Sequence, residues 1–132
     1  MRLSSNIKKF VFYRLPVVAL CIAIFWQSSF PGMITQPLFL HDDKVLHCLA
    51  YALLAFLATR SLVADRPDIT LFKIRVIAII FASLYGLSDE VHQAFVPTRD
   101  ASIGDFMADC LGSVLGTAFY LDFFLTKFIR RS

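Results

Sequence analysis

Residues 84–116 read LYGLSDEVHQAFVPTRDASIGDFMADCLGSVLG and concentrate ionisable groups in an otherwise apolar chain. The first half extends an apolar helix to Glu90, the only glutamate of the sequence, and the second half opens another apolar helix with Asp105 and Asp109. Because a charged side chain inside an apolar helix is costly, such residues mark a functional site or a paired network. We therefore start from this stretch in predicting both the fold and the site.

The composition is that of a membrane protein. Of the 132 residues, 58% are hydrophobic and 17% charged, whereas soluble domains are usually about 45–50% apolar. We predict one domain, residues 1–132, that folds as an all-α, compact bundle of four transmembrane helices. The three cysteines occupy apolar segments without metal-ligand spacing, so we infer buried small side chains, no disulfide and no cysteine metal site. These are Cys21, Cys48 and Cys110.

The apolar runs predict spans at about 15–29, 43–62, 74–95 and 102–127. No small-x-small cleavage site follows the first run, so we expect a retained helix rather than a signal peptide, with Trp26 at the membrane interface. The loop after it passes Pro31 and Pro37, and His41 is interpreted as a loop residue. Pro97 cannot continue a helix, which places a turn between the last two spans.

The distribution of basic residues predicts the orientation in the membrane. Eleven of the 13 lysines and arginines lie in the N-terminal segment, in residues 60–75 around the loop between the second and third spans, and in the C-terminus. By the positive-inside rule both termini are cytoplasmic, and seven of the ten carboxylates, with all three histidines, lie on the outer side. We therefore expect a bacterial plasma-membrane protein whose polar site faces outward. No phosphate-binding loop or dinucleotide fingerprint is present, and the basic excess fits anionic lipid, so we predict no cofactor and no nucleic-acid partner.

Helical spacing places the polar residues on narrow stripes. One stripe lies on the third span, one on the fourth and one on the second, and we expect the third and fourth to face each other through close glycine contacts. The stripes are Ser83, Gly86, Glu90 and Gln93; Asp105, Asp109, Gly112 and Gly116; and Asp43, His47, Ala50, Tyr51 and Leu54.

The second and fourth spans both begin on the outer side, beside Lys44 and Arg99. Helix N-termini and arginine bind anions, so a phosphate head group fits this region. The carboxylates would then serve as acid–base groups, as partners for arginine, or as ligands of a divalent ion bridging to phosphate; we assign no metal site. The candidate catalytic residues are His47, Glu90, Asp105 and Asp109, and the candidate substrate-binding residues are Lys44, Tyr51, Gln93 and Arg99.

Structural interpretations stand beside these assignments. Asp42 or Asp43 is placed to cap the second span, and Ser102-x-x-Asp105 reads as a capping box. Asp89 and His92 lie off the Glu90 stripe and are interpreted as solvated residues. A further alternative is a structural network that fixes the register of the helices. Its members would be Glu90, Gln93 and Arg99.

The run G-x-x-x-E-x-x-Q-x-F-x-P-x-R, followed by an aspartate and G-x-x-x-G, resembles the core motif of the VanZ-like family. The D-x-x-x-H-x-x-x-Y run of the second span resembles the family as well, so the likeness covers residues 43–116. The family pattern most often has asparagine where this chain has Asp109. The matching residues of the core motif are Gly86, Glu90, Gln93, Phe95, Pro97, Arg99, Asp105, Gly112 and Gly116.

The resemblance implies a cell-envelope membrane protein of a family named for an accessory of teicoplanin resistance, with no settled reaction. We expect a protein that binds or acts on an anionic lipid or a lipid-linked envelope precursor and affects glycopeptide susceptibility. The alternative is a non-catalytic membrane scaffold whose polar core is structural. A proton-coupled carrier is disfavoured, because the ionisable groups gather on one side of the membrane.

Overall fold

The computed structural model describes residues 5–30 and 42–129, and these are helical without a strand. The expected loop residues Pro31, Pro37 and His41 lie outside the described residues. The elements are α1 (Ser5–Lys9), η1 (Phe10–Arg14), α2 (Leu15–Ser28), α3 (Asp42–Asp65), α4 (Leu71–Gln93), α5 (Ile103–Ala118), η2 (Phe119–Leu125) and α6 (Thr126–Ile129).

Four stretches of helix are long and apolar enough to cross a bilayer, which confirms the predicted number of spans. Large apolar side chains such as Phe72, Phe95 and Ile103 point away from the protein and are 72–82% exposed. In water these side chains would be a liability, whereas in lipid they are solvated. The chain is an integral membrane protein. Its spans are Asn6–Ser28, Asp42–Asp65, Leu71–Gln93 and Ile103–Leu125.

The first span begins earlier than predicted. The expected start near residue 15 rested on the basic residues before it, but α1 and η1 continue the helix back to Ser5. The turn at η1 is π-helical, and the Leu15 N–H donates to the Phe10 carbonyl five residues back. This wider turn precedes Pro16, whose ring would otherwise meet the carbonyl four residues earlier. The proline is therefore accommodated within a continuous helix.

The tightest helix pair is α3 with α5, and it depends on two glycines. A Cβ at Gly112 would overlap the Cys48 carbonyl oxygen, and one at Gly116 would overlap the Ala52 carbonyl oxygen. The sequence predicted that these glycines face the third span, which is α4. They face α3, the second span, so this prediction was wrong. A glycine stripe indicates close approach of a second backbone without specifying which helix provides it.

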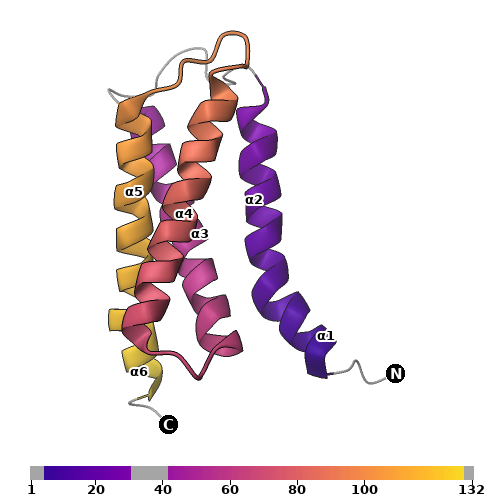
Figure 1. Cartoon of the computed structure of the whole chain (residues 1–132), viewed down its shortest axis with the longest axis vertical. Coiled ribbons are helices and arrows are strands. Elements are labelled where there is room, and N and C mark those ends of the chain that lie inside the picture. The colour runs from indigo at the N-terminus through magenta and orange to yellow at the C-terminus, as the bar shows by residue number, and fades with distance from the viewer. Residues whose placement is uncertain (1–4, 31–41, 130–132) are drawn as a thin grey trace.

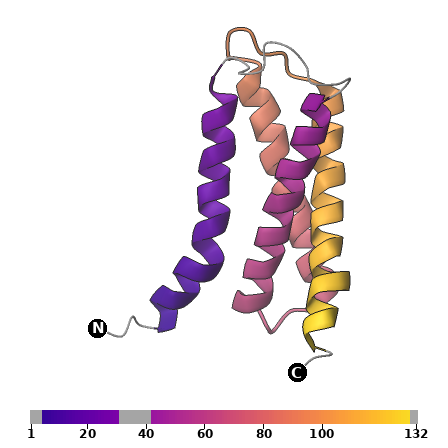
Figure 2. The same cartoon turned by 180° about the vertical axis from the view of Figure 1, so that it is seen from behind.

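Helix α4 packs on this pair through small residues at four-residue spacing, namely Ala78, Ala82 and Gly86. Helix α2 lies at the edge of the group, beside α3 and α4 (Figures 1 and 2). Within α2, Ile24 and Ser28 are the buried residues. The protein is thus a compact set of α3, α4 and α5 with α2 attached along one side.

Ion pairs gather at the end of the bundle where α1 and α6 lie (Figure 1). Arg14 Nε lies 2.7 Å from Asp65 Oδ2, and Arg75 pairs with Asp122 on η2. In the loop between α3 and α4, hydrogen bonds from the Arg66 guanidinium hold the pKa of Asp68 below its ordinary value. The predicted site residues lie toward the opposite end.

Candidate functional site

Three helices bring His47 of α3, Glu90 of α4 and Asp109 of α5 together. His47 Nδ1 lies 2.9 Å from Asp109 Oδ1 and 3.8 Å from Glu90 Oε1. The Asp109 side chain is fully buried and the Glu90 side chain is 7% exposed. With Asp109 ionised and His47 neutral, this bond has its proton on Nδ1, and Nε2 is then an acceptor. We call these three residues the triad.

Gly86 leaves the space that the Asp109 carboxylate occupies. A Cβ added to Gly86 would lie 2.7 Å from Asp109 Oδ2, so only a residue without a side chain leaves room for the acid. One turn further along α5, the Ser113 hydroxyl donates to the Asp109 carbonyl at 2.8 Å and is thereby satisfied within its own helix. Asp109 Oδ2 and Glu90 Oε1 make no hydrogen bond within the described residues. The triad therefore contains two buried acceptor oxygens without a donor among the described residues.

The Glu90 side chain also accepts a hydrogen bond at the end of the turn that connects α4 to α5. Its Oε2 accepts from the Ser102 backbone N–H at 2.8 Å, and the Ser102 hydroxyl accepts from the Gly104 N–H at 3.1 Å. In a capping box the acid three residues after Ser102 would make the first of these bonds. The predicted box is thus half formed, because Glu90 of α4 replaces Asp105 as the acceptor.

Asp105 is instead paired with Lys44. The two side chains meet at 2.9 Å, and the lysine also lies 3.5 Å from Asp43 Oδ2. This pair joins the start of α3 to the start of α5. Asp42, the other expected cap, accepts from the Asp43 N–H through Oδ1 at 2.8 Å. The positive charge expected to attract an anion at Lys44 is therefore compensated by carboxylates.

Arg99 contacts α2 through its guanidinium rather than pairing with a triad carboxylate. Its Nε donates to the Phe30 carbonyl and its Nη2 to the Gln27 carbonyl, both at 3.0 Å. The preceding residue, Thr98, has a φ of 68°, a left-handed conformation that is rare for a β-branched residue. This turn aims the arginine at α2, and no carboxylate pairs with it among the described residues.

Two residues expected to be solvated make contacts within the bundle. Asp89 is 6% exposed and accepts from Gln93 Nε2 at 3.1 Å, while His92 Nε2 lies 3.0 Å from the Ser29 hydroxyl. The interpretation of both as solvated was therefore wrong. Asp89 was detectable, since it lies seven residues after buried Ala82 and four before Gln93 on one helical face. The His92 contact depends on where α2 lies, which the sequence does not indicate.

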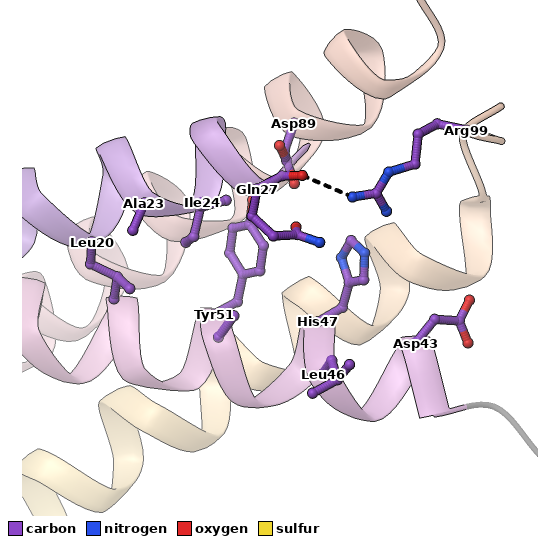
Figure 3. A pocket seen from close by; sticks show the side chains of 11 residues that line it. Leu20, Ala23, Ile24, Gln27, Asp43, Leu46, His47, Tyr51, Asp89 and Arg99 are labelled. Atoms are coloured by element: carbon purple, nitrogen blue, oxygen red, sulfur yellow. Dashed lines mark hydrogen bonds between the residues drawn. The ribbon is translucent and has the colours of Figure 1, made fainter. Parts of the chain in front are cut away.

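A cavity of about 360 Å³ lies between α2 and the helices α3 and α4, next to the triad. Figure 3 shows His47, Gln27 and Arg99 pointing into its polar end, with the Arg99 bond to Gln27 dashed. Tyr51 lies one turn after His47 on α3. Its ring is parallel to the imidazole, and the ring centroids are 6.4 Å apart. Its buried hydroxyl has no hydrogen-bond partner within the described residues. The apolar part of the wall is formed by Leu20, Ala23, Ile24, Leu46 and Ala50.

All eight sequence-predicted site residues thus lie in one region, though with different partners. His47, Glu90 and Asp109 form the triad, and Tyr51 and Arg99 line the cavity beside it. Lys44 and Asp105 form a pair at the helix starts, and Gln93 is bonded to Asp89. Gln27, which lies outside every predicted stripe, was missed.

The fold and this region define a polytopic membrane protein with a buried histidine–carboxylate cluster beside an amphipathic cavity. The model of the VanZ/LLP1 family matches residues 5–126, nearly the whole chain. The chain belongs to this family. The comparisons with curated proteins and with solved structures gave no match.

Proposed function

We propose that the protein binds the anionic head group of a membrane lipid, or of a lipid-linked envelope precursor, in the cavity beside α2. The shape and lining of the cavity carry this proposal. Leu20 and Ile24 line one part, and the other part is polar, with Gln27, His47, Arg99 and the carboxylates of Asp43 and Asp89. An amphiphile with one polar end matches such a lining, because its tail meets apolar walls while its head meets fixed polar groups.

Arg99 is the group that would contact the anion. Two backbone carbonyls hold the guanidinium in place, and these use two of its five N–H donors. Carbonyl oxygens orient the group without cancelling its charge. A phosphate or carboxylate at the polar end would therefore meet a cation that is already positioned, which reduces the ordering cost of binding.

The triad offers acid–base chemistry at the same place. Asp109 orients His47, whose Nε2 is then an acceptor, the arrangement that a general base requires. A reaction at a bound head group would use this nitrogen, with water as the attacking group. The alternative is a non-catalytic scaffold, favoured by the bond of Glu90 to the Ser102 N–H, which gives this carboxylate a structural task.

The proposal also includes the side of the membrane that the cavity faces, and the distribution of basic residues supports this part. With 11 of 13 basic residues in the terminal segments and in residues 60–75, the cavity faces the extracytoplasmic side. Lipid-linked envelope precursors and glycopeptides are met there. A change in glycopeptide susceptibility on deletion or overexpression is the cellular effect that we expect.

Arg99→Lys tests the binding proposal. Lysine retains the charge but cannot hold both carbonyls, so we expect at least a tenfold loss of co-purifying anionic lipid, measured by mass spectrometry of the detergent-purified protein. Arg66→Lys, in the loop at the other end of the bundle, is the matched control and should keep its lipid. Unchanged lipid content in Arg99→Lys would reject the arginine contact.

Glu90→Gln and His47→Gln separate the catalytic from the scaffold interpretation. Glutamine at position 90 can still accept from the Ser102 N–H, so the fold is expected to persist while acid–base function is lost. If cells carrying either variant at wild-type protein levels have the same glycopeptide susceptibility as cells carrying the wild-type protein, the scaffold interpretation is favoured. If the variants are present at wild-type protein levels but no longer affect glycopeptide susceptibility, chemistry at the head group is favoured.

A further inference from the structure

We propose that the triad is a binding site for one divalent transition-metal ion, held by His47, Glu90 and Asp109. This inference goes beyond the proposed function and does not depend on it. The three residues come from three helices, and one ligand atom of each lies within 4.8 Å of the others. Each ligand is therefore fixed by a different element of the compact part of the bundle.

The distances fit a single ion. Two ligands of a tetrahedral metal lie about 3.3–3.6 Å apart when the metal–ligand bonds are about 2.0–2.2 Å long. His47 Nδ1 is 2.9 Å from Asp109 Oδ1 and 3.8 Å from Glu90 Oε1, so the observed separations lie on either side of that range. Small side-chain rotations would bring the three atoms into the coordination sphere.

Two unpartnered oxygens provide a second, independent observation. Glu90 Oε1 and Asp109 Oδ2 accept no hydrogen bond within the described residues, although Glu90 is 5% exposed and Asp109 is fully buried. Buried carboxylate oxygens are normally satisfied by a donor or by a metal. The nearest lysine, Lys44, is already paired with Asp105. A cation bound to Glu90 Oε1 would satisfy that oxygen, and Asp109 Oδ2 would be satisfied as well if the aspartate binds through both oxygens.

The donor set indicates the class of metal. One imidazole nitrogen with two carboxylate oxygens suits Zn²⁺, Mn²⁺, Fe²⁺ or Co²⁺, whereas Mg²⁺ and Ca²⁺ prefer oxygen ligands alone. Three protein ligands leave at least one position open, and His47 borders the cavity. The ion would take the place of the proton on Nδ1, and that proton would move to Nε2, which keeps the imidazole neutral.

The test uses the full-length protein purified in detergent and stripped with a chelator. Calorimetric titration with Zn²⁺ should give one ion per chain. Asp109→Asn, Glu90→Gln and His47→Gln should each weaken binding by at least about tenfold. The matched controls are Asp89→Asn, an equally buried neighbour of Glu90, and His92→Gln; both should bind as the wild type does.

Co²⁺ substitution provides a readout that does not depend on the variants folding. Nitrogen and oxygen ligands give visible absorption without a thiolate charge-transfer band, which a site involving Cys48 or Cys110 would produce. A wild-type protein that binds no Zn²⁺, equal binding by all three ligand variants, or a thiolate band would each overturn the proposal. None of these results bears on lipid retention, which Arg99→Lys tests separately.

Discussion

Thr98 holds the least favourable backbone conformation among the described residues. A left-handed conformation costs an L-residue about 1–2 kcal/mol, whereas glycine adopts it readily at a smaller cost in chain entropy. We therefore expect Thr98→Gly to raise the free energy of unfolding by about 0.5–1 kcal/mol in a steric-trapping measurement. Thr98→Ala, which keeps the Cβ, is the control and should bring no gain. A less stable Thr98→Gly protein would contradict this account of the turn.

The contacts of Arg99 and Lys44 predict which charges are energetically coupled. Lys44 and Asp105 meet at 2.9 Å, so a double-mutant cycle with Lys44→Met and Asp105→Asn should give a coupling energy of about 1 kcal/mol. Arg99 and Glu90 bond to different backbone groups, and Arg99→Gln with Glu90→Gln should be additive within about 0.5 kcal/mol. Strong coupling of the second pair would restore the register-fixing network as an explanation.

At the scale of the helices, the packing of the α5 glycines predicts that their substitution by alanine lowers the free energy of unfolding by different amounts. A methyl group at Gly112 or Gly116 would strike backbone atoms of α3, which cannot move without separating the helices. Each substitution should therefore lower the free energy of unfolding by about 1–3 kcal/mol. At Gly104 the methyl group would meet the flexible end of Lys44, at 2.9 Å from Cε, so Gly104→Ala should be nearly neutral. Equal losses at all three positions would contradict the packing described.

Much of the fold follows from the sequence, because apolar run length and proline placement act locally. The four spans were predicted from apolar run length, and the stripes that carry His47, Glu90 and Asp109 were predicted from helical periodicity. The helix that packs against the α5 glycines was not predicted, since a stripe of glycines indicates only that some other backbone approaches it closely. The hydrogen-bond partners of Arg99 and His92 lie at the end of α2 and in the two residues after it. The position of that helix depends on tertiary packing that no local pattern contains.

At the scale of the whole molecule, the orientation in the membrane remains a prediction. With both termini cytoplasmic, a cysteine at position 98 should react with a membrane-impermeant maleimide added to intact cells, in a background where Cys21, Cys48 and Cys110 are serine. A cysteine at position 68, in the loop at the opposite end, should react only after the membrane is opened. Labelling of position 98 solely from the cytoplasm would reverse the orientation and the proposed access to envelope precursors.

The cavity beside α2 has an edge that reaches the lipid-facing surface, since Ala23 and Leu46 line it and are themselves exposed. A ligand could then arrive by diffusing sideways within the leaflet, without crossing water. Its occupancy would be set by its mole fraction in the bilayer, and diluting the vesicles at fixed lipid composition would leave the bound fraction unchanged.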